Sequence, residues 1–352
     1  MSMISVLREL VPEPTAEHAR VASILSVANV DRWVASPRRG PGRPAWDRKV
    51  LVRAFLAKFV LQCPSTERLR HRLMADEGLR AALGMVGEVP SAATFSRAFR
   101  EFAYLRVGES AHEALVVQEY SELEVWHVAR DATAISSWER PVRAPKPPPA
   151  PKLKIGRPKG GNPAKPKVET RMQRQLVQSA ERAITELPTQ CTTGTKLDSN
   201  GFPHWWMGYK LHADVDEHGF PLSVILTSAN VHDCQVAIPL MKTTSARTKS
   251  VFYQLMDAGY LGKLILEAAM NLDQVPIVAP KARAGTPVIP LSPDRKERMK
   301  KRCAVERFFA QLKNNSALGA SRYRGYLKVN LQVMLAILAL CATMMLNKTG
   351  QI

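Results

Sequence analysis

The order of strands and helices after about residue 204 limits the possible folds more than any other feature of the sequence. Two β-prone runs, WWMGYKLHADVD and FPLSVILTSA, flank the turn Asp216–Gly219 and predict a hairpin. Helices are expected over 233–246, 260–271 and 300–315 and in the apolar C-terminal stretch, with short strands in SVFYQLM and VPIVA between them. A further strand is expected earlier, in VWHVARDATAISS. This order predicts an α/β fold in which helices flank a mixed sheet.

The N-terminal part of the chain has a different pattern and predicts an all-helical domain over residues 1–123. DRKVLVRAFLAKFVLQ has the apolar spacing of an amphipathic helix, and three further helical patterns follow it. The last, SAATFSRAFREF, separates its phenylalanines from Arg97 and Arg100. Short helices with arginines near the end resemble a helix-turn-helix module, which makes Arg97 and Arg100 candidate DNA contacts. Packing or dimerisation explains the same pattern without DNA.

The second domain is expected over residues 124–352, interrupted by a basic, Pro/Lys-rich insertion over 141–203. The formal net charge of +19 is concentrated in two stretches. Residues 141–168 hold eight basic residues, nine prolines and no acid, and residues 281–352 hold 14 basic and three acidic residues. Such local charge indicates a polyanion partner, most simply nucleic acid, although solvated basic segments are the alternative. GRPKG within the insertion resembles an AT-hook core, and a solvated loop is the alternative there too.

The cysteines indicate a protein of a reducing compartment such as the cytoplasm, and the apolar C-terminal stretch indicates a buried helix. The five cysteines are widely spaced and form no C-x-x-C pair, which argues against a disulfide framework or a structural zinc site. Residues 329–347 carry no charged side chain, which is nearly the length of a membrane span. Asn330, Gln332 and Thr343 interrupt this stretch, so we expect a buried helix, with a membrane or partner contact as the alternative.

Three acidic residues stand where phosphodiester chemistry would need them. Asp131 follows the first strand, Asp257 ends a later strand, and Glu306 lies on a predicted helix. Strand ends collect ligand-binding groups in α/β sheets. On the same helix, Arg302, Glu306 and Lys313 fall within an arc of roughly 40°, since each residue turns the helix by about 100°. Each acid also has an ordinary explanation, as a turn or helix cap or as an exposed i,i+4 ion pair.

Three carboxylates suit the hydrolysis or transfer of a phosphodiester. Two Mg²⁺ or Mn²⁺ ions can stabilise charge on the attacking and leaving oxygens and activate water or a 3′-hydroxyl. Hard divalent ions prefer carboxylate oxygens, whereas crowded carboxylates without a cation tend to take up protons. Arg302 and Lys313 would then hold flanking phosphates or restrain Glu306. Lys210, His212 and His232 are weaker candidates near the hairpin, and Trp205 and Trp206 would either stack on a base or pack.

These motifs resemble those of bacterial insertion-sequence transposases of the DDE superfamily, which have a ribonuclease-H-like catalytic core. The similar pieces are RDATAISS, GYKLHADVDEHGFPLSVILTSANVHD, LMDAGY and AVERFFAQLKN. The family signature Tyr-x2-Arg-x3-Glu-x6-Lys is matched by Arg302, Glu306 and Lys313, while Met299 replaces the tyrosine. The N-terminal stretch from PSTERLRHRLMADEGLRAALG to VPSAATFSRAFREF resembles the helical domain that precedes this core. The resemblance covers about residues 47–135 and 204–345.

The resemblance implies that Asp131, Asp257 and Glu306 bind two Mg²⁺ or Mn²⁺ ions. It implies cleavage at the terminal inverted repeats of an element, then joining of the freed 3′-hydroxyl to target DNA, by a homodimer on paired ends. Double-stranded DNA is therefore the expected partner, at the nucleoid and not at a membrane. A non-catalytic DNA-binding protein derived from a transposase, or a metal-dependent nuclease of the same fold, remains the alternative.

Overall fold

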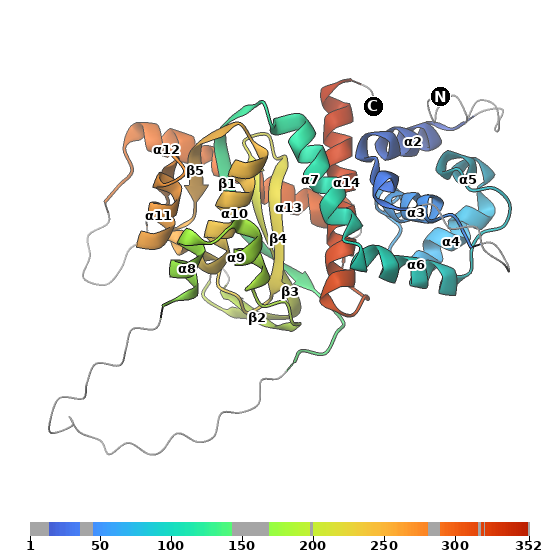
Figure 1. The fold of residues 1–352 in the computed structure, drawn as a ribbon, viewed down its shortest axis with the longest axis horizontal. Coiled ribbons are helices and arrows are strands. Elements are labelled where there is room, and N and C mark those ends of the chain that lie inside the picture. Colours follow the sequence, from blue (N-terminus) through green and yellow to red (C-terminus); the bar gives the residue numbers. More distant parts are fainter. Residues whose placement is uncertain are drawn as a thin grey trace, which may run out of the picture.

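A computed structural model describes residues 14–35, 45–142, 169–197, 200–280, 289–315, 318–319 and 321–350. A bundle of helices and a helix-covered sheet lie on either side of one long helix, α14 (Tyr326–Lys348) (Figure 1). Residues 143–168 of the basic insertion, which include its AT-hook-like piece, lie outside the described residues.

The N-terminal part is all-helical, as predicted. Side chains of Asp47, Ser65 and Ser91 each accept a hydrogen bond from a backbone N–H of the following first turn, which fixes where three of these helices begin. Phe55 lies at the centre, with its ring against three other phenylalanine rings on one later helix. The helices are α2 (Ala16–Ala28), the 3₁₀ turn η1 (Val30–Trp33), α3 (Arg48–Val60), α4 (Thr66–Ala75), α5 (Glu77–Leu83), α6 (Ala92–Tyr104) and α7 (Val107–Tyr120).

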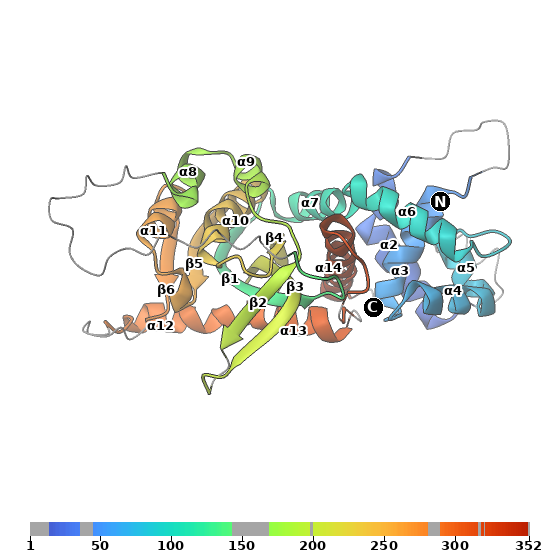
Figure 2. The same cartoon turned by 90° about the horizontal axis from the view of Figure 1, so that it is seen from below.

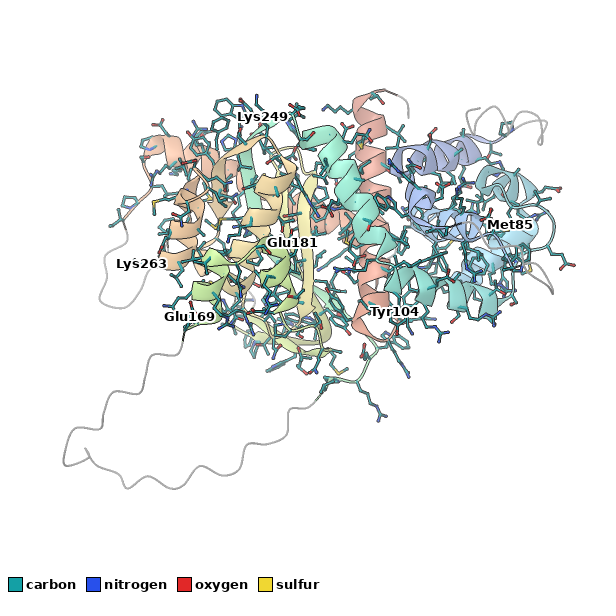
Figure 3. All side chains as sticks on the ribbon, viewed as in Figure 1. Met85, Tyr104, Glu169, Glu181, Lys249 and Lys263 are labelled. Carbon is teal, nitrogen blue, oxygen red and sulfur yellow. The ribbon has the colours of Figure 1, made fainter. Side chains whose placement is uncertain are left out.

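Helix α14 joins the two parts of the molecule. It packs against α2, α3, α6 and α7 of the helical part and against α13 and β4 of the sheet part, and α6 ends at Tyr104 beside it (Figure 3). The helix is long and apolar enough to cross a membrane, but 78% of its most apolar window is buried inside the protein. The interruptions in its apolar run also find partners, since Gln332 accepts from Ser321 and Asn330 donates to Glu109. The structure therefore gives α14 the role of a core helix.

The sheet has six strands and is mixed, as predicted. Antiparallel pairing joins β3 to β1, β2 and β4, whereas β1, β5 and β6 run parallel. The hairpin between β3 and β4 turns at Asp216–Gly219 as the sequence indicates, and the Asp216 carboxylate accepts the backbone N–H groups of His218 and Phe220. The strands are β1 (Glu124–Ser136), β2 (Thr192–Leu197), β3 (Pro203–Asp216), β4 (Pro221–Ser228), β5 (Ser250–Met256) and β6 (Val275–Val278).

Helices cover both faces of this sheet (Figure 2). One face carries α10 (Cys234–Arg247) together with α8 (Arg171–Val177) and α9 (Ala180–Thr185), which pack on α10. The other face carries α13 (Cys303–Asn315), which is preceded by α12 (Pro293–Met299) and the 3₁₀ turn η3 (Lys300–Arg302). Helix α11 (Lys263–Met270) contacts β6, α10 and α8. Within the expected insertion, residues 169–197 thus form α8, α9 and β2.

Candidate active site

Asp131 lies within β1 and Asp257 directly follows β5, which pairs with β1 in parallel, so the expectation that Asp131 follows its strand is wrong. Arg130 of β1 is level with Met256 of β5, and in both segments the next residue along the chain is an aspartate. The two carboxylates differ in their local partners. Asp131 Oδ1 accepts from the Ala132 N–H at 2.8 Å, and Asp257 Oδ1 accepts from the Gly259 N–H at 2.9 Å, where it caps the 3₁₀ turn η2 (Ala258–Tyr260). The expected capping role of Asp257 is therefore real and coexists with its place at the strand end.

Glu306 lies in the first turn of α13. Residues Ala304, Val305, Phe308 and Leu312 of this helix are fully buried against the sheet, which leaves Glu306 on the opposite, exposed side of its first turn. Helix α13 packs on β1 and β3. Because side chains alternate along a strand, Asp131 and its partner Ala213 point to one face of the sheet, and Arg130 and Asp214 to the other.

The Arg302 guanidinium links two of the three carboxylates. Its Nη2 donates to Glu306 Oε1 at 2.5 Å, and its Nη1 contacts Asp131 Oδ2 at 3.5 Å. Burial raises the pKa of Asp131, and the nearby charge of Asp257 raises it further, although the Ala132 N–H and Arg302 oppose the shift. A cation is thus already shared by carboxylates from β1 and α13, and a third carboxylate is close enough to act on Asp131.

A buried ion pair lies next to Asp131, on the opposite face of the sheet. Arg130 donates to both oxygens of Asp214 at 2.7 and 2.6 Å, and both side chains are fully buried. Thr244 of α10 donates to the same carboxylate at 2.8 Å. This bidentate pair joins β1 to β3 one residue before Asp131, so it fixes the position of Asp131 relative to β3.

Lys196 of β2 lies close enough to Asp131 for its charge to act on this carboxylate, and Lys313 of α13 lies close enough to Lys196 for their charges to interact. Lys313 lies on the last turn of α13, and its pKa is lowered by burial and by the positive charge of Lys196 on β2. The charge of Lys196 also acts on Asp131, whose pKa it lowers. Lys196 was not among the residues predicted for the site, because only the pairing of β2 with β3 brings this part of the chain toward it.

The other residues expected near the site lie on the α10 face. Lys210 donates to Val231 O at 2.9 Å and to Asp233 Oδ1 at 3.1 Å. His212 is completely buried, and its Nε2 and the Thr227 hydroxyl share a hydrogen bond of 2.9 Å. Burial lowers the pKa of His212 well below its ordinary value, so the ring is neutral. His232 is exposed, and its Nδ1 accepts from the Cys234 N–H.

The remaining candidates lie apart from the carboxylates. Arg97 and Arg100 are exposed on α6, on the far side of α14 from the sheet (Figure 1). Met299 ends α12, one turn before Arg302. Of the two tryptophans, Trp206 packs and donates from Nε1 to Tyr209 O at 2.9 Å, whereas Trp205 is 65% exposed.

The carboxylates have the donor atoms of a divalent-ion site, but they do not form a preformed set of ligands. Asp131, Asp257 and Glu306 offer only oxygen donors, which Mg²⁺ and Mn²⁺ prefer. Across the described residues, no three His, Cys, Asp or Glu side chains are grouped closely enough to hold a metal ion. Asp131 and Glu306 meet instead at Arg302, so the donor set fits the ion while its present arrangement is held by a side-chain cation.

This fold is that of a ribonuclease-H-like DDE domain preceded by a helical part, and comparison with protein families agrees. The family model described as the transposase DDE domain matches residues 189–342, and the one described as Transposase domain (DUF772) matches residues 5–101. The first contains Asp257 and Glu306, while Asp131 precedes it. No curated protein and no solved structure matches the chain. The chain belongs to the insertion-sequence DDE transposases.

Proposed function

We propose that this transposase cuts DNA at the ends of its insertion sequence and transfers the cut strand to target DNA, with Asp131, Asp257 and Glu306 as its catalytic triad. The observation that carries the proposal is the bridge made by Arg302. It places carboxylates from β1 and α13 at one cation, beside the strand end that bears Asp257. The family generally uses divalent metal, and the donor types here agree with that.

In this proposal the three carboxylates hold two Mg²⁺ or Mn²⁺ ions. When bound, such ions activate water or a 3′-hydroxyl and stabilise the charge of the phosphodiester transition state. Arg302 gives up part of its contact with Asp131 and Glu306, and pairs with a DNA phosphate together with Lys313. Arg97 and Arg100 bind DNA away from the site, and Lys210 orients Asp233 and contacts DNA at the edge of the sheet.

The reaction consists of two displacements at phosphorus. Water attacks the phosphodiester at the element end, the P–O bond to the 3′ oxygen breaks, and a 3′-hydroxyl is released. That hydroxyl then attacks a target phosphodiester and expels another 3′ oxygen, so that one bond forms for each bond broken and no cofactor is consumed. We expect the substrates to be the terminal inverted repeats and target duplex, bound by a homodimer on paired ends in the cytoplasm, at the nucleoid.

The test compares Asp257→Asn with Glu297→Gln on DNA that carries both flanks of the reading frame. Asparagine keeps the hydrogen bond to Gly259 and removes the charge, so we expect Mg²⁺-dependent nicking to fall at least a thousandfold while DNA binding persists. Glu297 is exposed on α12 and pairs only with Lys300 among described residues, which makes it a control for loss of a nearby acid. Nicking by Asp257→Asn at the parental rate would refute the triad.

The products separate the proposal from its alternatives. Joined strands in the parent protein support transposition, whereas hydrolysis products alone would indicate a nuclease of the same fold. Binding without any cleavage by the parent, with both Mg²⁺ and Mn²⁺, would indicate a non-catalytic DNA-binding protein. Each result is read on the same DNA, so the three functions cannot be confused.

A further inference from the structure

A cavity of about 370 Å³ lies where the helical part meets the chain that leads into α14. It is lined by segments that are far apart in the sequence, and we call it the junction cavity. Its lining includes Lys58 of α3, Ser65 and Thr66 at the start of α4, Trp138 after β1, and Arg322 and Tyr323 before α14. The cavity therefore forms only when both parts of the molecule are folded together.

The walls of the junction cavity are fixed by contacts from both parts. The Tyr323 ring stacks on Phe99 of α6 with the ring centroids 4.1 Å apart, and its hydroxyl shares a hydrogen bond of 3.2 Å with the Thr66 hydroxyl. From the sheet part, the Ser137 hydroxyl donates to Tyr323 O at 3.4 Å. These contacts hold the start of α14 beside α6 (Figure 1). The cavity is thus a built feature of the fold.

Lys58 brings a buried charge to this cavity. Its side chain is only 2% exposed, and its Nζ lies 4.5 Å from the centroid of the Phe59 ring. Burial lowers the pKa of Lys58 to about 8, so most of the side chain is still charged at pH 7. Within the part of the chain that the structure describes, no carboxylate pairs with this ammonium and no oxygen accepts a hydrogen bond from it.

The other cation buried to this extent is treated differently by the fold. Arg130 is completely buried, and both of its hydrogen-bonded partners are the oxygens of Asp214, at 2.7 and 2.6 Å. A buried charge without such a counterion is costly, because it gives up its water and receives nothing in return. Lys58 is in that position, so an anion that enters the cavity would be stabilised by it.

Two further groups around the cavity also favour an anion. The start of α4 faces it, where Ser65 caps one N–H and the first-turn N–H groups such as that of Thr66 have no acceptor inside the helix. The Arg322 guanidinium lies over the Trp138 ring, 5.2 Å from its centroid, and pairs with no carboxylate of the described residues. Among the described residues that line the cavity there is no acid. Its charge is therefore positive from every side.

We propose that the junction cavity binds a phosphate group, held by the Lys58 ammonium, the start of α4 and Arg322. A phosphate offers the charge that Lys58 lacks and oxygens that can accept from several donors at once. The group is either a backbone phosphate of DNA or a free phosphate, since the recognising chemistry is the same. Its ligands come from both parts of the molecule, so binding would tie these parts together.

This site is separate from the candidate active site. Asp131 and Ser137 are joined by extended chain, which at about 3.3 Å per residue spans roughly 20 Å. The inference therefore does not use the proposed triad, and the two can fail independently.

The first test measures the thermal unfolding midpoint of the full chain at pH 7.0, in sodium phosphate and in sodium chloride of equal ionic strength. The variants are Lys58→Met and Lys49→Met. Lys49 lies on the same helix, about 13 Å away along its axis, and does not line the cavity. We expect phosphate to raise the parental midpoint by about 3 °C more than that of Lys58→Met, and Lys49→Met to respond as the parent does. Comparing variants removes the general stabilising effect of phosphate on proteins.

The variants should fold. Methionine has nearly the length of lysine without its charge, and replacing a buried charge by an apolar group is neutral or stabilising. In chloride, Lys58→Met should therefore melt at or above the parental midpoint. Arg322 is exposed, so Arg322→Gln leaves the core unchanged and should lose part of the same response to phosphate.

The second test identifies the source of the phosphate. Binding of a 30-bp duplex is measured over a range of salt concentrations in buffer that contains EDTA, so that no strand is cut. If the cavity takes a backbone phosphate, Lys58→Met should weaken binding about tenfold and lower the slope of log affinity against log salt by about one. Lys49→Met should leave both values unchanged.

Either response confined to Lys58→Met and Arg322→Gln supports the site. A change in the phosphate response indicates a free phosphate, and a change in DNA binding indicates a backbone phosphate. The inference is refuted when Lys58→Met matches the parent in both tests, or when Lys49→Met shows the same losses as Lys58→Met.

Discussion

Because His112 is buried in its neutral form, we predict that acid weakens the junction between the helical part and the sheet. This histidine lies on α7, is 1% exposed, and donates from Nε2 to Pro221 O at 3.0 Å. Burial and the charge of Arg247 lower the pKa of His112 to about 3, against 6.5 for a free histidine. The folded protein thus binds fewer protons than the unfolded chain below pH 6.5, so this contribution is complete above pH 6.5 and is lost as the pH falls toward 3.

The size of the effect follows from these two values. Between pH 7.5 and pH 5.0 the unfolded chain protonates His112 almost fully while the folded protein does not, which removes about 2 kcal/mol from the free energy of unfolding. His127 and His212 also have lowered pKa values and add to the same trend. His112→Gln keeps a donor for Pro221 O but cannot be protonated, so its loss between the two pH values should be smaller by about 2 kcal/mol.

Urea unfolding followed by tryptophan fluorescence at pH 7.5 and 5.0 measures the difference. His71→Gln serves as the control for replacing a histidine, because His71 is 57% exposed on α4. If His112→Gln and the parent lose equal stability over this interval, the buried neutral state of His112 is refuted.

Three further predictions concern the core and the sheet. Arg130→Met should lower the free energy of unfolding by about 3–5 kcal/mol, because it leaves Asp214 buried and unpaired. The double change Arg130→Met with Asp214→Leu should recover most of this loss, and chemical unfolding of both variants measures it. Gly208→Ala should cost about 3 kcal/mol, since Gly208 has a φ of 143° and a Cβ would lie 2.2 Å from Ile135 O; a thermal unfolding midpoint no lower than the parental one would contradict it. Phe55→Ala should cost about 3–5 kcal/mol by removing a fully buried ring, and a loss under 1 kcal/mol in urea would show that the helical core can collapse around the gap.

Much of the fold could be predicted from local sequence pattern. The hairpin of β3 and β4, the helices α3 to α6, and the buried side of α13 follow from apolar spacing and caps, which depend on nearby residues alone. Helix α2 was not predicted, because its apolar residues in AEHARVASILSVA are mixed with small ones and show weak periodicity. Strand β2 was also missed, since TTGTKL is short, mostly polar and contains a glycine, and only pairing with β3 makes it a strand.

The candidate site was predictable in its residues but not in its contacts. The spacing of Arg302 and Glu306 indicates an i,i+4 pair, and the structure contains it. The contact from Arg302 to Asp131 spans 171 positions in the chain and depends on how α13 lies on the sheet. The same applies to Lys196, which reaches the site through strand pairing. Alternation along a strand also shows that Trp205 and Trp206 face opposite ways, without showing which of them is covered.

The position of α14 has a consequence for how the protein is made. This helix is translated after every other described element, yet α2, α3 and α7 pack against it. While the chain is still on the ribosome, the early helices therefore lack the helix that covers one side of their hydrophobic core. Loss of the segment through a nonsense mutation would leave them exposed, so damage near the end of the gene would remove the N-terminal module along with the catalytic one.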